Sequence, residues 1–168
     1  MFDIISRNMR EIAPTGNTLE EDRISWTRAM QEELQNPDKH WVLAFDGEAL
    51  VGYVLYRIEN HSALRAPLPG GECILHMDEI QIEKAYQGDG ETFPLLMGKM
   101  LYDAKEAGAR TVHTHVNKQN AKSQGIVRAM GLRIVKEKPC GFIYEGKAKD
   151  AYTRFGKNII YEVYGALE

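Results

Sequence analysis

Residues 79–101 read EIQIEKAYQGDGETFPLLMGKML, and they constrain the fold more than any other stretch of the chain. The segment begins as a strand, passes through Gly88 and Gly90, and continues with the spacing of an amphipathic helix. Both glycines permit positive φ and a close approach of another molecule to the backbone. The first N–H groups of the helix lack intrahelical partners and carry partial positive charge. The turn therefore predicts an anion site suited to phosphate, with an ordinary tight turn as the alternative.

The other segments predict a single domain over residues 1–168, in the mixed α/β class, with one central sheet. Asp46–Gly47 indicates a tight hairpin, and Thr18 with Glu21 has capping-box spacing at the start of a helix. Asn120 is the expected N-cap of a later helix. We expect strands at 2–6, 40–59 (two, joined by the hairpin turn), 73–83, 109–117, 132–137 and 158–165, helices at 17–36, 91–107 and 120–131, a loop at 60–72, and an irregular segment with a short helix at 138–157.

The net charge and the composition argue against two classes of partner, nucleic acid and membrane. The net charge of −3 gives the chain no general basic field, so a nucleic-acid partner is not expected. No apolar run approaches the roughly 18 residues that span a bilayer, so a membrane partner is not expected either. The first residues lack the basic start and apolar run of a signal peptide, and Cys73 and Cys140 lack the spacing of metal ligands. These features predict a cytoplasmic protein with reduced thiols.

Three segments resemble the acyl-CoA-binding core of the GNAT-type N-acetyltransferases. EIQIEKAYQGDGET is similar to the family's strand EIxV followed by an aromatic residue and Gln/Arg-x-x-Gly-x-Gly/Ala. LAFDGEALVGYVLY at 43–56 looks like the family's hairpin, and VNKQNAKSQGIVRAMGL at 116–132 looks like its V…N..A…Y…GF segment. The resemblance covers about residues 40–137. It implies a GNAT-like fold, with a mixed, mostly antiparallel sheet of about six or seven strands that splays in the middle, and three or four helices on its two faces.

The resemblance also implies that acetyl-CoA is the co-substrate and that no metal is needed. Backbone N–H groups of residues 88–92 would hold the pyrophosphate of coenzyme A. The pantetheine arm would run between the strands at 73–83 and 109–117 and pair like an extra strand, with a hydrogen bond from Asn120. The residues that the resemblance assigns to coenzyme A are Ile80, Gln81, Ile82, Gln87, Gly88, Asp89, Gly90, Glu91, Thr92, Asn120 and Ser123.

Three residues depart from the family's pattern. Asp89 stands where many members have Lys or Arg, and a carboxylate beside a pyrophosphate is repulsive. We expect its side chain to turn to solvent or to cap the helix. Thr92 replaces the final Gly/Ala and adds bulk where the backbone should approach phosphate. Val127 stands where members often place a Tyr that protonates the departing thiolate. Either another side chain donates this proton, or transfer proceeds without a dedicated acid because the thiol of coenzyme A is a fair leaving group.

Transfer of an acetyl group to a primary amine needs a neutral nucleophile, whereas an amine with a pKa of about 10.4 is protonated at pH 7. A positioned carboxylate takes that proton directly or through water. Glu79, at the family's EI position, is the expected base, and a salt-bridged or solvated strand carboxylate is the alternative. Tyr144 is the expected replacement acid, with Tyr152 as a second candidate. An N–H near Ile82, at an expected bulge, would polarise the thioester carbonyl.

His113 and His115 lie on one face of the expected strand at 109–117. Their spacing suits two metal ligands, an auxiliary base in a substrate cleft, or ordinary hydrogen-bonded strand histidines. No third ligand is evident in the sequence, so we expect ordinary strand histidines.

Together these features predict an N-acetyltransferase in which an amine attacks acetyl-CoA directly in a ternary complex. The acceptor is a small molecule or peptide that carries a primary amine. A non-catalytic acyl-CoA-binding or interaction protein on the same scaffold is the alternative, favoured by the three departures. Family members dimerise, and a homodimer is left open. A cationic acceptor is suggested by four neighbouring carboxylates, Glu72, Asp78, Glu79 and Glu83.

Overall fold

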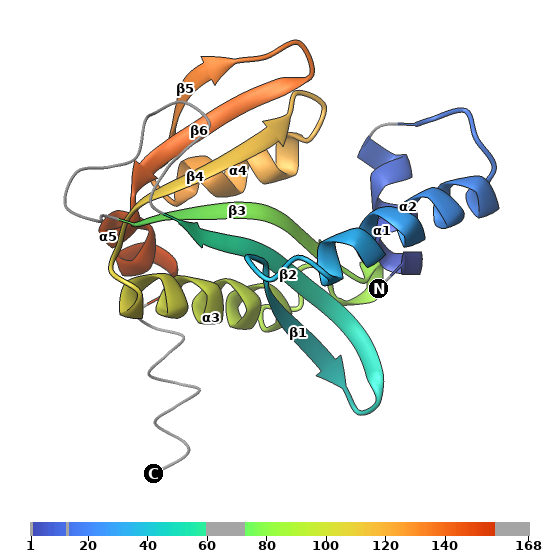
Figure 1. Ribbon diagram of the computed structural model, residues 1–168, viewed down its shortest axis with the longest axis horizontal. Coiled ribbons are helices and arrows are strands. Elements are labelled where there is room, and N and C mark those ends of the chain that lie inside the picture. The colour runs from blue at the N-terminus through green and yellow to red at the C-terminus, as the bar shows by residue number, and fades with distance from the viewer. Residues whose placement is uncertain (1, 13, 60–72, 157–168) are drawn as a thin grey trace.

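The sheet is mixed because β3–β4 is parallel and its other four strand pairs are antiparallel. The computed structural model describes residues 2–12, 14–59 and 73–156, and within them six strands follow the order β1-β2-β3-β4-β6-β5 (Figure 1). The strands are β1 (His40–Asp46), β2 (Ala49–Glu59), β3 (Cys73–Ile82), β4 (Ala109–Asn117), β5 (Arg133–Glu137) and β6 (Gly141–Lys147). The helices are α1 (Phe2–Ile12), α2 (Leu19–Leu34), α3 (Thr92–Glu106), α4 (Ala121–Ala129) and α5 (Ala148–Ala151), with a 3-10 turn at Lys84–Tyr86 and a π-turn at Tyr152–Gly156.

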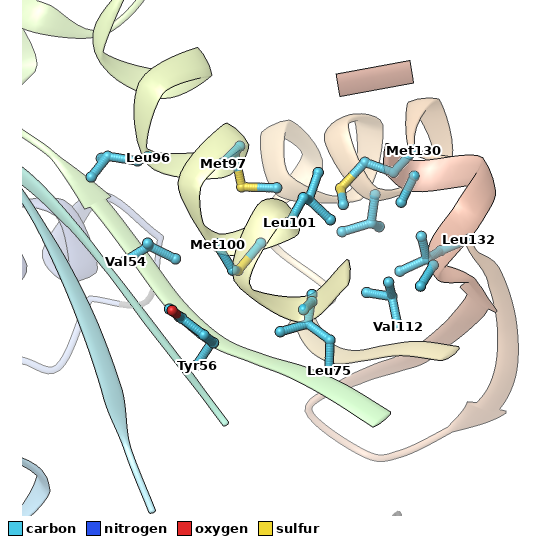
Figure 2. Close-up of a cluster of buried hydrophobic side chains, with 14 of the residues drawn as sticks. Val54, Tyr56, Leu75, Leu96, Met97, Met100, Leu101, Val112, Met130 and Leu132 are labelled. Carbon is cyan, nitrogen blue, oxygen red and sulfur yellow. The ribbon is translucent and has the colours of Figure 1, made fainter. Parts of the chain in front are cut away.

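The main core lies between the sheet and three helices on one of its faces. Helices α3, α4 and α5 bury apolar side chains there together with Leu75 and Val112 of the two central strands. Figure 2 shows Met97, Met100 and Leu101 of α3 gathered in this core. The spacing of these three residues is that of a single helical face, which is why the sequence pattern located α3 correctly.

A smaller core covers part of the opposite face. Ile5 of α1 and Met30 of α2 pack on Tyr53 of β2, and all three are almost fully buried. Helices α1 and α2 lie beside each other in Figure 1. The predicted strand at 2–6 is wrong, since this segment is the first turn of α1. Ile5 and Met9, four residues apart, both face the smaller core, so the helical period prevails over the short apolar run.

The segment at 138–157 was expected to be irregular, and this is wrong for its first half, where β6 forms an inner strand of the sheet. Both glycines of β6 are required by close packing. A Cβ on Gly141 would lie 2.5 Å from the carbonyl oxygen of Val116, and one on Gly146 would lie 3.1 Å from that of Gly131. The short helix expected near Ala148 is confirmed as α5. The predicted loop at 60–72 and strand at 158–165 lie outside the described residues.

The other predicted elements are confirmed, and so is the fold class. The hairpin turns at Asp46–Gly47, where Gly47 has a φ of 57°. Thr18 and Glu21 form both bonds of a capping box at the start of α2. In the part of the chain that the structure describes, none of the helices is long and apolar enough to cross a membrane.

Helix α3 offers a matched test of the main core. Met100 is fully buried, whereas Leu95 on the same helix is 43% exposed. We expect Met100→Ala to lower the free energy of unfolding by about 2–5 kcal/mol, because it removes buried apolar surface and leaves a cavity. Leu95→Ala should cost less than about 1 kcal/mol. Urea unfolding of both variants measures the difference, and equal losses would contradict this assignment of the core.

Candidate functional site

Strands β3 and β4 part in the middle of the sheet. They pair from Cys73 and Ala109 as far as Met77 and Thr114, and the Thr114 hydroxyl donates a 2.8 Å hydrogen bond to the carbonyl oxygen of Met77 at the last pair. Beyond this point β3 pairs with β2 alone and β4 with β6 alone, within the described residues. The facing edges of 78–82 and 115–117 therefore offer backbone groups to an extended molecule, as in β-augmentation.

A bulge in β3 lies at the start of this split. Leu55 of β2 pairs with Glu79 while the next residue, Tyr56, pairs with Met77, so Asp78 is the extra residue. The Asp78 carboxylate accepts hydrogen bonds from Lys39 at 2.7 Å and from Arg57 at 2.8 Å. The bulge was expected near Ile82, and that position is wrong, since Ile82 pairs regularly with Gly52.

The glycine turn adopts the backbone that its sequence predicted. Gly88 and Gly90 have φ values of 88° and 84°, and a Cβ on either would meet no atom within 4 Å. Helix α3 begins directly afterwards, at Thr92. An open, positive-φ turn ahead of a helix N-terminus is the geometry of an anion site.

Asp89 fills this anion site with its own carboxylate. One oxygen accepts hydrogen bonds from the backbone N–H groups of Glu91 at 2.9 Å and Thr92 at 3.0 Å, and the other accepts from the Thr92 hydroxyl. These bonds, that from the hydroxyl most of all, hold the pKa of Asp89 below its usual range. The expected cap is thus present, and it occupies two of the N–H groups that the sequence assigned to pyrophosphate.

The start of α4 lies against the same turn and adds a cation. The Lys122 ammonium donates a 2.9 Å hydrogen bond to the side-chain oxygen of Gln87, whose nitrogen donates to the carbonyl of Ile82. Asn120 caps α4 by accepting from the N–H of Ser123, as expected. The sequence analysis did not include Lys122, because only the fold brings it to the turn.

Three further β3 residues are assigned to coenzyme A, and their side chains lie on different faces of the sheet. Ile80 and Ile82 pack towards the main core. The side chain of Gln81 instead accepts a 2.8 Å hydrogen bond from Asn8 of α1, so only its backbone faces the split.

Glu79 is half-buried and forms no salt bridge with another described residue. It accepts a short hydrogen bond from the hydroxyl of Tyr53, which is itself fully buried beside α1 and α2. Burial raises the pKa of Glu79, against the opposing effect of the hydrogen bond from Tyr53. A carboxylate with a raised pKa holds a proton more readily near neutral pH, which suits a general base.

Tyr144 lies on the opposite face from Glu79, in the main core with Val127. Its backbone pairs with Thr114, at the point where β3 and β4 part. Its hydroxyl is buried without a hydrogen-bond partner among the described residues. The second candidate acid, Tyr152, lies under the ammonium of Lys105 in the last turn of α3, at the other end of that helix from the glycine turn.

A cavity of about 450 Å³ opens beside the split and includes His113 and His115 in its lining. Both histidines therefore share one face, as expected. In the described ranges 2–12, 14–59 and 73–156, no group of three His, Cys, Asp or Glu side chains is arranged to hold a metal ion.

The fold and the split agree with the sequence comparison. The profile of the Acetyltransferase (GNAT) family matches residues 3–132. The chain belongs to the GNAT acetyltransferase family. No curated protein matches this GNAT chain in sequence.

Solved structures support the same fold for this GNAT chain. PaiA N-acetyltransferase from Thermoplasma acidophilum, in complex with coenzyme A, aligns with a TM-score of 0.65 over 87% of this chain and 89% of its own, at 17% identity. PH1933 from Pyrococcus horikoshii OT3 aligns with a TM-score of 0.67 over 87% of each chain, at 14% identity. Arabidopsis thaliana NAA60, in complex with a bisubstrate analogue, aligns with a TM-score of 0.59 over 87% of this chain and 91% of its own, at 16% identity.

The cap at Asp89 predicts a pH-dependent stability. Because the pKa of Asp89 is lowered in the folded state, its contribution is present above the unfolded pKa of about 3.9 and is lost as the pH falls through the lower folded value. Asp89→Ala should therefore lower the melting temperature at pH 7, and the gap to the wild type should close at acid pH. Thermal unfolding from pH 2.5 to pH 7 measures the gap. Glu91→Ala is the matched control, and a gap that is constant with pH would exclude a charged cap.

Proposed function

We propose that this GNAT protein transfers the acetyl group of acetyl-CoA to a primary amine by direct attack in a ternary complex. The observation that carries the proposal is the split between β3 and β4, which exposes two strand edges next to an anion-binding turn. The free edges suit the amide groups of a pantetheine arm. The Asp89 carboxylate, held by two N–H groups, supports an anion site at this turn and stands in for a phosphate there.

Coenzyme A has two ways to use the turn. Its diphosphate would displace Asp89 from the N–H groups of Glu91 and Thr92, or it would bind at Gly88 and Gly90 while Asp89 stays in place. Lys122 supplies a nearby positive charge in either case. When bound, acetyl-CoA supplies an activated thioester, and the chain's own residues orient the amine and move its protons.

Two side chains are proposed for proton transfer. Glu79 takes a proton from the incoming amine, because burial favours the protonated form of this carboxyl group. Tyr144 protonates the departing thiolate, because Val127 stands at the position where family members often have a Tyr for this role. Its buried hydroxyl, without a described partner, is available to donate. The two residues lie on opposite faces of the sheet, so the thiolate is protonated from the side of α3 and α4, while the amine approaches from the other side.

The acceptor is a primary amine of no fixed chemical class, because the nearby carboxylates do not select a cation clearly. Asp78 is ion-paired with Lys39 and Arg57, and Glu83 is ion-paired with Arg7. These carboxylates are therefore largely neutralised by the chain itself, and the cationic acceptor rests on Glu79 alone among the described members of the group. Glu72 lies outside the described residues.

A non-catalytic acyl-CoA-binding protein remains the second candidate, favoured by the occupied N–H groups at Asp89 and by Val127. Incubation with acetyl-CoA and a panel of small amines and peptides, followed by measurement of free thiol and acetylated product, separates the two. Product with at least one amine supports the acetyltransferase. A rise in melting temperature with coenzyme A, but no turnover on any amine, would favour the binding protein.

The turn gives a prediction for affinity. Asp89→Asn keeps the size of the side chain and removes its negative charge, so coenzyme A should bind severalfold more tightly. Pantetheine, which has no diphosphate, should bind equally to the wild type and the variant. Calorimetric titration measures both ligands. Glu91→Gln is the matched control, and an equal gain for pantetheine would place the diphosphate elsewhere.

The base gives a prediction for pH dependence. Glu79→Gln should lower the rate about a hundredfold at pH 7, because the variant cannot accept the amine's proton. The loss should shrink towards pH 10, where more of the amine is already neutral. Steady-state rates across this range, with Glu83→Gln as the matched control, measure the trend. A loss that is constant with pH would argue against the role of Glu79.

A further inference from the structure

The cavity beside the split contains a chain of three hydrogen-bonding side chains that the proposed mechanism does not use. The carboxylate of Glu59 on β2 lies 3.0 Å from Nε2 of His76 on β3. Nδ1 of His76 lies 3.0 Å from Nδ1 of His113 on β4. Both rings are more than nine-tenths buried and line the cavity, as does Glu59.

The far nitrogen of His113 ends this chain inside the protein. Nε2 of His113 is buried and has no hydrogen-bond partner among the described residues. Because burying a polar atom without a partner is unfavourable, a ligand group in the cavity is the natural partner of this nitrogen.

The chemistry of these three side chains determines which ring nitrogens carry a proton. A carboxylate only accepts, so Nε2 of His76 carries hydrogen and donates to Glu59. In a neutral His76 ring, Nδ1 is then an acceptor and Nδ1 of His113 is the donor. Nε2 of His113 is left with a lone pair, on a ring that lines the cavity. Burial, and then the nearby His76, lower the pKa of His113 to about 4, which agrees with a neutral ring at pH 7.

We propose that Glu59, His76 and His113 form a proton relay that accepts an N–H proton from the acceptor amine in this cavity. The proposal rests on the proposed acetyl transfer. His113 is the catalytic residue, since it touches the amine, and His76 and Glu59 are positioning residues that carry the proton away.

The bonds, electrons and protons of the relay balance when the transfers are written in order. The amine nitrogen forms a bond to the acetyl carbon, the carbon–sulfur bond breaks, and the sulfur takes the electron pair and then a proton. The nitrogen gives a proton to Nε2 of His113, Nδ1 of His113 gives one to Nδ1 of His76, and Nε2 of His76 gives one to Glu59. The low pKa of His113 is no obstacle, because the ring loses one proton as it gains another.

Other charged groups face His113 from each neighbouring strand. Arg57 on β2 is paired with Glu59 at 3.1 Å, and Asp78 on β3 is paired with Arg57. His115 on β4 and Lys138, before β6, also line the cavity. Glu145 on β6 is the direct cross-strand neighbour of His113.

Nitrogen NMR of the wild-type protein tests the relay without turnover. We expect Nε2 of His113 to resonate as an unprotonated nitrogen and Nδ1 as a protonated one, with the reverse assignment for His76. A protonated Nε2 on His113 would overturn the proposal.

Kinetics of matched variants test the proton transfer. Glu59→Gln keeps an acceptor for His76 but cannot take up a proton, so kcat should fall at least tenfold while the His113 tautomer is unchanged. His113→Gln should lower kcat about a hundredfold, with KM changed less than about threefold. His40→Gln, at an exposed residue of β1 that does not line the cavity, should have no effect. Full kcat in both Glu59→Gln and His113→Gln would overturn the relay.

Failure of the relay and failure of the proposed function give different results. If the wild type acetylates an amine and the two variants match it, the relay is wrong and the acetyltransferase stands. If the wild type acetylates no amine, the proposed function fails and proton transfer through the relay fails with it. The tautomer measurement then reports only whether His113 offers an acceptor to a ligand.

Discussion

The parting of β3 and β4 after Met77 and Thr114 is the constraint on which the rest of the site depends. A parallel pair buried on both faces is normally continuous, because an unpaired edge inside a sheet leaves backbone groups without partners. Here β2 and β6 continue the pairing on the outer edge of each strand, so only the backbone groups that face the split lack a ladder partner among the described residues. The extra residue at Asp78 bends β3 at the same point and is held by Lys39 and Arg57. The unpaired edges are thus stabilised by their neighbours, and they suit a ligand with amide groups of its own.

The glycine turn presents a conflict between folding and binding at one helix N-terminus. An N-terminus without a cap leaves N–H groups unpaired, and a capping carboxylate satisfies them. Asp89 therefore favours the free protein, and in the proposed complex it would compete with the diphosphate of coenzyme A for the same donors. A member of the family with Lys or Arg at this position has the opposite balance. The competing carboxylate predicts a protein that binds coenzyme A more weakly than such relatives, with the turn well ordered in the absence of ligand.

Local sequence patterns predicted most of the elements but less of the site. Periodicity was sufficient for α3, which buries one regular face, and the capping residues Thr18 and Asn120 located the starts of α2 and α4. The pattern failed at 2–6, where Ile5 meets a tertiary partner, and at β6, where Gly141 and Gly146 are needed for close packing rather than for a turn. The family resemblance located the turn and Glu79. Lys122 and the chain from Glu59 to His113 join residues far apart in the sequence, so no local pattern could bring them together.

Proton bookkeeping explains why the sheet presents groups on two faces. An ammonium ion loses two protons when it becomes an amide, and the departing sulfur regains one. A single base would have to release its first proton before taking the second. In the proposed mechanism, Glu79 beside Tyr53 and His113 at the end of its chain would give the nitrogen two separate acceptors on the face opposite α3. Tyr144 on the α3 face would then serve the sulfur alone. The proposed reaction centre would lie at the split, where β3 and β4 cease to pair.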